Sequence, residues 1–321
     1  MDKIKLGITI GDINGIGPEV IIKALAHENV RKYIVPIIYG SSKIISYYKN
    51  TVNLRDFSFT TISEASKSQY NKINVLNCWN EDVDITVGKV TEEGGKYAFL
   101  ALKRATDDLK TDQIDALVTA PINKQAMKMH GYEHPGHTEY ITQEMGGKSI
   151  MMMVSDVMRI ALVSNHLPVK DVASALTKET LKSKIKILNK SLIEDFGIEK
   201  PVIAILGLNP HAGDEGTIGN EEQEIIRPVI IEAKKAGLIV SGPYSADGFF
   251  GSSQFTKVDG ILAMYHDQGL IPFKALSFGS GVNFTAGLSA VRTSPDHGTA
   301  YDIAGSDQAS PDSFIQPYIV L

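Results

Sequence analysis

Cysteine is almost absent from this 321-residue sequence, in which Cys78 is the only one. One thiol cannot form an intrachain disulfide, so the chain is not a disulfide-stabilised scaffold, and a reducing cytoplasm is its expected compartment. A lone cysteine can act as a nucleophile. However, Cys78 stands in VLNCWNED, with no histidine nearby and no helix starting beside it, so we do not expect it to carry the chemistry.

Long hydrophobic runs are also missing. No stretch approaches the roughly 18 apolar residues of a membrane span, and the first apolar segment is too short for the core of a signal peptide. The net charge of −5 is spread along the chain without long blocks of one sign. We therefore expect neither a nucleic acid nor a membrane as a partner.

Short apolar runs alternate with amphipathic segments along the chain. The runs predict strands at 4–10, 34–40, 114–122, 150–154, 159–164, 202–208 and 259–265. The amphipathic segments predict helices at 93–110, 180–196 and 221–236, where Pro228 must lie in the first turn or kink the helix. This alternation predicts an α/β protein with mostly parallel sheets, and the length favours two domains. The sequence shows no flexible linker between the two domains, which favours domains connected by several passages of the chain between them.

Three of the predicted strands run directly into a histidine. RIALVSNHLP leads to His166, VIAILGLNPHAG to His211 and GILAMYHDQG to His266. The carboxyl ends of parallel strands meet at one edge of a sheet, where open α/β sheets bind their ligands. Three imidazoles there suit a catalytic divalent metal with open positions for substrate.

A simpler explanation is that each histidine is a hydrogen-bonded turn residue. The sequence alone supports this explanation and a metal site about equally. Imidazole suits Zn, Co, Ni and Fe, whereas Mg is less natural. Asp247 and Asp267 are candidate further ligands or partners of the histidines. Plain turn formation is the simpler explanation for both.

Two segments carry groups that can bind an anion. In HPGHTEYITQEMGG, Thr138 is the expected N-cap of a helix, with His137 just before it. Further on, Lys274, Asn283 and Arg292 lie in a stretch with Gly279, Gly281 and Gly287 that lets a ligand approach the backbone. Such groups clamp phosphate or carboxylate, although ordinary capping and solvated charge explain them as well. The loop GDINGIGPE does not match a nucleotide loop and indicates a tight strand-to-helix turn.

Eight motifs occur in order over nearly the whole chain: GDINGIGPEV, TAPINK, PGHTEY, SNHLP, GLNPHAG, AMYHDQG, GVNFTAGL and RTSPDHGTA. Together they resemble the 4-hydroxythreonine-4-phosphate dehydrogenase family of pyridoxal phosphate biosynthesis. The resemblance implies an isopropylmalate dehydrogenase-like fold, with two α/β/α domains and an inter-domain cleft. We expect a discontinuous first domain of residues 1–125 plus 275–321 and a second of 126–274. The resemblance also implies a homodimer whose active site is shared between subunits.

The family's functional residues map onto positions of this sequence. Its metal-binding histidines fall on His166, His211 and His266, and the resemblance implies Zn, Co or Mg there. Its substrate-binding positions fall on His137, Thr138, Lys274, Asn283 and Arg292. The segment DHGTAYDIAG resembles the loop that holds the adenosine part of NAD in isopropylmalate dehydrogenase-like enzymes, which implies cofactor contacts by Gly298 and Asp302.

The implied reaction is oxidation of 4-(phosphooxy)-L-threonine by NAD or NADP, followed by decarboxylation to 3-amino-2-oxopropyl phosphate. Asp247 is the candidate proton acceptor, and Lys274 is a second candidate catalytic group. One departure concerns the first motif, where the family often has Gly-Asp-Pro-Ala-Gly and this chain has Ile13 and Asn14. A paralogous dehydrogenase of 4-phospho-D-threonate or 4-phospho-D-erythronate is therefore an alternative. A metal-dependent hydrolase or aldolase, or a binding protein without chemistry, are further alternatives.

Overall fold

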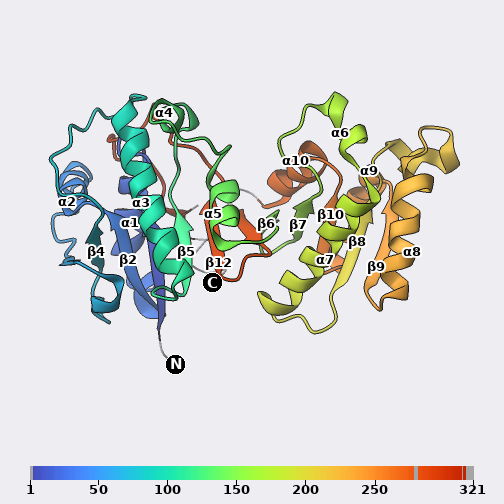
Figure 1. The fold of residues 1–321 in the computed structure, drawn as a ribbon, viewed down its shortest axis with the longest axis horizontal. Coiled ribbons are helices and arrows are strands. Elements are labelled where there is room, and N and C mark those ends of the chain that lie inside the picture. The colour runs from blue at the N-terminus through green and yellow to red at the C-terminus, as the bar shows by residue number, and fades with distance from the viewer. Residues whose placement is uncertain (1–2, 278–280, 313, 316–321) are drawn as a thin grey trace. The chain divides into compact units, whose positions relative to one another are not determined.

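The computed structural model describes residues 3–277, 281–312 and 314–315 (Figure 1). The chain forms two compact units, residues 1–147 with 288–321 and residues 148–287. Each unit has a mostly parallel sheet with helices packed on it, which confirms the predicted α/β class. The domain ranges expected from the sequence are also discontinuous, but in the structure the chain passes between the units at other positions, after Gly147 and after Gly287. Helix α5 (His137–Met145) packs on the first unit's α3, and β11 (Val282–Ala286) pairs with the second unit's β6.

The first unit is built on a sheet with the strand order β3-β4-β2-β1-β5-β12, and the pairs described in it are all parallel. Buried apolar residues fill its central strands on both faces, as expected where helices cover a parallel sheet. The strands are β1 (Ile4–Thr9), β2 (Ile34–Gly40), β3 (Thr60–Ile62), β4 (Asn74–Asn77), β5 (Ala116–Thr119) and β12 (Val291–Pro295).

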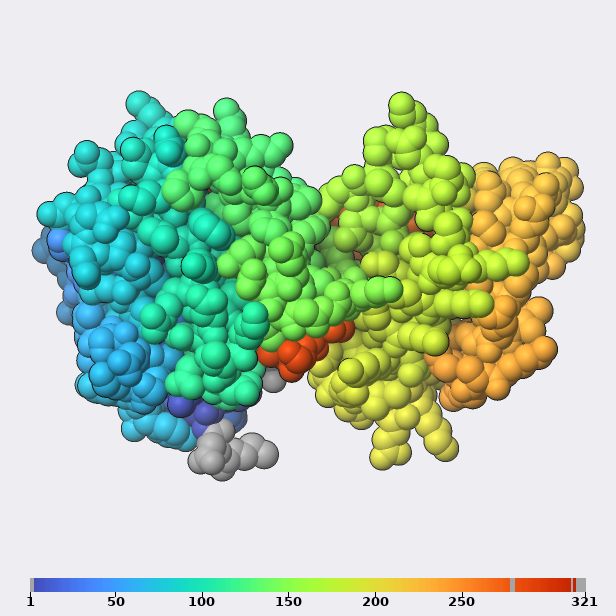
Figure 2. All heavy atoms as spheres, in the orientation of Figure 1, coloured from blue at the N-terminus to red at the C-terminus, as the bar shows by residue number. Residues whose placement is uncertain are grey.

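Helix α3 (Glu92–Lys110) is the longest helix described in the first unit and packs on β1, β2 and β5. It begins where predicted because the Thr91 hydroxyl caps it by accepting from the Gly94 amide. In Figure 2 the side chains of α3, coloured teal, form part of the outer face of this unit. The other helices are α1 (Gly17–Ala26), α2 (Ser42–Thr51), α4 (Lys124–Met129) and α5, with 3-10 turns at Val30–Lys32 and Ala65–Lys67.

The second unit has the strand order β11-β6-β7-β10-β8-β9. Strand β6 is antiparallel to both neighbours, whereas β7, β10, β8 and β9 run parallel. The strands are β6 (Ile150–Val154), β7 (Arg159–Leu162), β8 (Val202–Leu206), β9 (Ile239–Tyr244), β10 (Gly260–Ala263) and β11. The adjacent parallel strands β7, β10 and β8 therefore end at the same edge of this sheet.

Helices cover both faces of this sheet. A Cβ at Gly260 of β10 would meet Leu188 and Leu192 of α7, whereas Ala263 of the same strand lies against Gly269 of α10. Because alternate strand residues face opposite sides, α7 and α10 pack on opposite faces. Figure 1 shows α7 in front of these strands. The helices are α6 (Val169–Ala175), α7 (Lys178–Glu194), α8 (Arg227–Lys235), α9 (Ala246–Gly251) and α10 (His266–Ser277), with shorter turns at Pro210–Gly216, Glu222–Ile226 and Gln254–Lys257.

All seven predicted strands are present. The segment predicted as a helix at 221–236 divides into a π-helical turn, Glu222–Ile226, and α8, with Pro228 in the first turn of α8. Proline cannot donate a backbone hydrogen bond to the preceding turn, and the helix changes from π-helical to α-helical just before Pro228. Among the described residues, no helix has both the length and the apolar character needed to cross a membrane.

Candidate functional site

The three strand-end histidines follow adjacent parallel strands, as predicted. His166 follows β7, His266 follows β10 and His211 follows β8. The rings of His166 and His266 lie 5.9 Å apart between centroids, at an interplanar angle of 39°. An imidazole nitrogen binds zinc at about 2.0–2.1 Å, so one ion fits between two rings at this separation. The sheet thus brings together two histidines that are far apart in the sequence.

His266 has a carboxylate partner. Its Nδ1 lies 2.7 Å from Oδ1 of Asp267. A neutral ring that donates from Nδ1 leaves Nε2 with a free lone pair, and histidines that bind metals commonly have such a partner. Asp267 thus matches the expected role of a partner to a histidine.

His211 lies in an unusual backbone segment. His211, Ala212, Asp214 and Glu215 all have positive φ, between 42° and 53°, and Gly213 between them has φ 79°. Left-handed backbone costs L-residues about 1–2 kcal/mol each, so neighbouring contacts must hold this turn. Sequence reasoning predicted a turn here but not its handedness.

Glu222 supplies those contacts. This carboxylate is only 1% exposed and accepts from the amides of Leu208 and Asn209, both at 2.7 Å, and from the Asn209 side chain at 2.9 Å. The same carboxylate lies against Gly213, where a Cβ would come within 2.6 Å of Oε2. A buried, fully hydrogen-bonded carboxylate therefore fixes the chain just before His211.

Asp247 lies at the start of α9. The hydroxyl of Ser245 donates to it, and this bond, with a smaller contribution from the charge of His211, lowers its pKa. A lowered pKa keeps the carboxylate ionised at neutral pH and makes it a weak proton acceptor. This argues for Asp247 as a hydrogen-bond acceptor beside His211 rather than as a general base.

The three histidines do not form a ready-made metal cage. Within residues 3–277, 281–312 and 314–315, no three His, Cys, Asp or Glu side chains are grouped closely enough to hold an ion. The donor chemistry nevertheless suits a divalent ion. His166 and His266 lie close together, and His266 has its carboxylate partner.

Lys274 and Asn283 lie on α10 and β11 of the same unit. Lys274 is eight residues after His266, which at about 1.5 Å per residue places its Cα some ~12 Å further along the helix. Asn283 pairs with Met153 across β11 and β6, and its buried Oδ1 has no hydrogen-bond partner among the described residues. Gly279 lies outside the described residues. A common ligand site of Lys274 and Asn283 stays a prediction.

In the first unit, Arg292 on β12 is a buried cation. It is 2% exposed and donates to the hydroxyls of Thr138 at 3.1 Å and Thr119 at 2.5 Å. Burial lowers the pKa of the Arg292 guanidinium to about 10, so it remains charged at neutral pH. Sequence reasoning missed Thr119. Its signal was a hydroxyl residue at the carboxyl end of an otherwise apolar strand.

The expectation that Thr138 caps α5 is wrong. The N-cap is Gly136, with an extended backbone, and the helix begins at His137. Thr138 is therefore inside the first turn, where its hydroxyl accepts from Arg292 instead of from a helix amide. The structure thus joins Thr138 and Arg292, two predicted anion-binding residues that are far apart in the sequence.

His137 lies beside this cation. Burial, with the charges of Arg292 and Lys124, lowers its pKa well below 6.5. Its Nε2 is buried and has no hydrogen-bond partner in the described part of the chain. A neutral ring next to a charged guanidinium is a donor that an anionic ligand can use.

His137 should make the ligand-free protein less stable in mild acid. The unfolded chain takes up a proton near pH 6.5, whereas the folded chain does not, so stability falls as pH drops below 6.5. Between pH 7.5 and 5.5, His137→Asn should remove about 1 kcal/mol of this loss. Urea unfolding of both proteins at the two pH values measures it. An identical pH dependence would contradict it.

The predicted cofactor loop packs against the N-terminal loop of the first unit. The Tyr301 hydroxyl donates to buried Asp12 at 2.6 Å, and the Ile16 amide donates to Thr299 O at 3.0 Å. Gly298 and Asp302 are exposed, and a Cβ at Gly298 would meet nothing within 4 Å. Both are accessible to a ligand, and their cofactor role stays a prediction. Sequence reasoning missed Asp12, which sits in the first motif.

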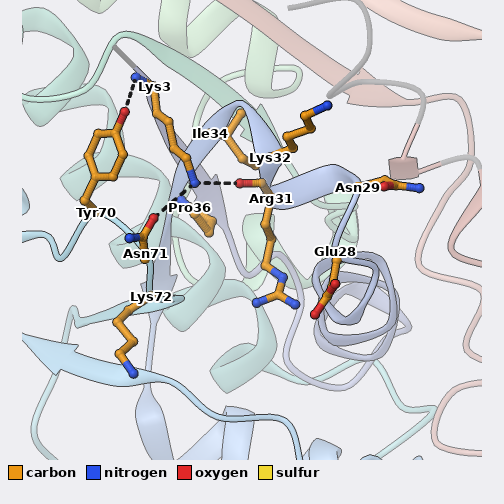
Figure 3. A pocket seen from close by; sticks show the side chains of 10 residues that line it. All are labelled: Lys3, Glu28, Asn29, Arg31, Lys32, Ile34, Pro36, Tyr70, Asn71 and Lys72. Carbon is orange, nitrogen blue, oxygen red and sulfur yellow. Dashed lines mark hydrogen bonds between the residues drawn. The ribbon is translucent and has the colours of Figure 1, made fainter. Parts of the chain in front are cut away.

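A cavity of about 330 Å³ lies elsewhere in the first unit (Figure 3). Ile34 and Pro36 line it at the amino end of β2, with Lys3 just before β1. The predicted substrate and cofactor residues of this unit do not line it: Arg292 lies on β12, His137 and Thr138 begin α5, and Gly298 and Asp302 follow β12. The cavity therefore contributes nothing to the site described above.

Comparison with known proteins shows which family the chain resembles. The family profile "Pyridoxal phosphate biosynthetic protein PdxA" matches residues 32–319. A Bacteroides thetaiotaomicron protein named 4-hydroxythreonine-4-phosphate dehydrogenase is 49% identical over 321 residues, which cover 99% of this chain and 88% of the relative. An Oceanobacillus iheyensis protein named provisionally as a D-threonate 4-phosphate dehydrogenase is 36% identical over 316 residues, covering 97% and 95%.

Solved structures give the same result. The crystal structure of a 4-hydroxythreonine-4-phosphate dehydrogenase from Burkholderia phymatum has 35% identity and a TM-score of 0.85, covering 98% of this chain and 96% of that one. The match extends over both units rather than over a shared motif alone. The chain belongs to the PdxA family of pyridoxal phosphate biosynthetic proteins.

Proposed function

We propose that this protein is an NAD(P)-dependent oxidative decarboxylase of 4-(phosphooxy)-L-threonine. It oxidises the C3 hydroxyl, releases CO2 and yields 3-amino-2-oxopropyl phosphate for pyridoxine 5'-phosphate synthesis. Beyond the family, the observation that supports this most is the buried Arg292, whose charge lies beside Thr138 and the neutral His137. We propose that the protein works in the cytoplasm as a homodimer whose subunits share the active site.

Arg292, Thr138 and His137 are proposed to bind the substrate's phosphate. A guanidinium offers several N–H donors in one plane, which matches phosphate oxygens. The Thr138 hydroxyl already bonds Arg292, so the guanidinium is held in place before substrate arrives. Lys274 on α10 and Asn283 on β11 are proposed as further substrate-binding residues.

His166, His211 and His266 are proposed to hold a divalent ion, Zn, Co or Mg. When bound, such an ion supplies Lewis-acid polarisation of a hydroxyl and stabilises developing negative charge. Asp267 orients the His266 ring, and Glu222 fixes the turn that carries His211. Asp247, kept ionised by Ser245, is proposed to accept a hydrogen bond from the reacting group. Lys274 is proposed as the other catalytic group.

NAD or NADP is proposed to bind the loop at residues 296–305. Exposed Gly298 leaves room for a ligand against the backbone, and the Asp302 carboxylate suits the ribose hydroxyls. The bonds of Tyr301 to Asp12 and of the Ile16 amide to Thr299 hold the loop against the first unit.

A second candidate is a dehydrogenase of 4-phospho-D-threonate or 4-phospho-D-erythronate. The provisionally named Oceanobacillus relative supports it, as does the Ile13-Asn14 pair in the first motif. These acids have the same phosphate but carry a hydroxyl where phosphothreonine carries an amino group. Arg292, Thr138 and His137 contact only the shared phosphate in this proposal, so they do not distinguish the substrates.

A substrate panel separates the candidates. With metal and NAD saturating, we expect NADH absorbance to rise with 4-phosphothreonine, with kcat/KM at least about tenfold above that for 4-phosphothreonate, a difference of about 1.4 kcal/mol. Preference for phosphothreonate would assign the protein to the second candidate. Parallel reactions without nucleotide are the control, because product formation there would indicate a hydrolase or aldolase.

A further inference from the structure

The turns that carry His166, His211 and His266 are joined to one another by hydrogen bonds. The backbone of Met264 takes part in both connections. Met264 is the first residue after β10 and lies two residues before His266. Its carbonyl accepts from the backbone amide of Ser164 at 3.2 Å and from the Ser164 hydroxyl at 2.9 Å. Since Ser164 precedes His166 by two residues, these bonds fix the His166 turn to the His266 turn.

Gln268 makes the corresponding connection to the His211 turn. Its Oε1 accepts from the Met264 amide at 2.7 Å, and its Nε2 donates to the carbonyl of Gly207 at 2.6 Å. Gly207 is the first residue after β8 and lies beside the Glu222 carboxylate, which holds the following amides. One side chain thus bonds to the backbone at the ends of two strands.

The position of Gln268 explains why a side chain is needed there. The ladder between β8 and β10 ends at the pair of Leu262 with Ile205. No further pair between these strands is described, and the Gln268 side chain bridges Gly207 and Met264, donating through its NH2 group and accepting through its oxygen. The side chain therefore takes the place of the next connection between the strands.

We propose that Gln268 is a positioning residue that sets the separation of His211 and His266, and thereby the divalent-ion affinity of the histidine set. Among the described residues, the Gln268 side chain bonds to backbone groups only, and it is not itself proposed as a ligand. This inference rests on the proposed function, because it assumes that the three histidines hold an ion. Contacts outside the ligand set commonly change metal affinity by about 10- to 100-fold.

The experiment titrates metal-free full-length protein with Co²⁺ and follows binding by calorimetry and visible absorption. Gln268→Met keeps the side-chain length but removes both hydrogen bonds, and we expect its Co²⁺ dissociation constant to rise about 10- to 100-fold. Gln268→Glu keeps the acceptor for the Met264 amide and should weaken binding less than Gln268→Met does. Excess Co²⁺ should restore most of the kcat of both variants.

Gln113→Met is the matched control. Gln113 is exposed three residues after α3, and its side chain also donates to a backbone carbonyl, that of Thr111, at 3.2 Å. Its Co²⁺ affinity should equal that of the wild type. If Gln268→Met lowers the metal-free thermal midpoint but binds Co²⁺ as tightly as wild type, the role of Gln268 is purely structural and the inference is overturned. If wild-type protein binds no Co²⁺, the histidine site itself is overturned, which is a different result.

Discussion

Arg292→Met should reduce kcat/KM for the phosphorylated substrate by about 10³-fold, mainly through KM. Removing one partner of a buried charged contact costs about 2–5 kcal/mol, and here the lost contact is the one proposed to bind the phosphate. The kcat/KM of Arg292→Lys should lie between those of Arg292→Met and wild type, because lysine keeps a charge but loses the planar arrangement of donors. Steady-state kinetics with NAD saturating measures both.

Arg104→Met is the control for the Arg292 variants. Arg104 lies on the surface of α3 and forms a part-exposed ion pair with Asp108 at 3.4 Å. Such pairs contribute little, so its kinetics should match wild type. A second readout is thermal stabilisation by inorganic phosphate, which wild type should show and Arg292→Met should lose. An unchanged KM in a folded Arg292→Met protein would refute the phosphate assignment.

His166→Ala and His211→Ala should each lower kcat by about 10³-fold, because a metal polarising the hydroxyl contributes several kcal/mol. Each variant should also bind less than one Co²⁺ per chain under conditions where wild type binds one. Chelator treatment of wild type should give the same loss, and added Co²⁺ or Zn²⁺ should reverse it.

His27→Ala serves as the comparison for the histidine variants, since His27 is an exposed residue at the end of α1. Its activity and Co²⁺ stoichiometry should equal those of wild type. Full activity of His166→Ala would show that this histidine holds no catalytic ion. Because metal content is measured directly, an inactive but fully metallated His211→Ala would assign His211 to catalysis rather than to metal binding.

The sequence predicted the strands that are apolar along their whole length, such as β2 and β8, because parallel strands covered on both faces leave a continuous hydrophobic run. It missed β3, which has only three residues, and β9, which contains Gly242 and Pro243 and has several exposed positions. It also predicted no strand in the glycine-rich stretch that contains β11. That strand is stabilised by pairing with β6, and a partner strand cannot be seen in a local window.

For the candidate site, the sequence placed His166 and His266 near each other, because strand ends in a parallel sheet share an edge, and their rings do lie 5.9 Å apart. That His211 joins them stays a prediction. It placed Thr138 at the wrong helix position, since glycine at position 136 can cap a helix without a side chain. Thr119 and Glu222 were not predicted. Their importance arises from Arg292 and Asn209, partners that only the folded chain brings near.

The left-handed turn at residues 211–215 has an evolutionary consequence. Gly213 has positive φ, and any side chain there would collide with Glu222, nine positions later in the chain. A lineage that replaces one of these residues must therefore repair the other in order to keep His211 in place. Among orthologues, residues 213 and 222 are expected either to be substituted together or to stay unchanged, although neither one would touch the substrate.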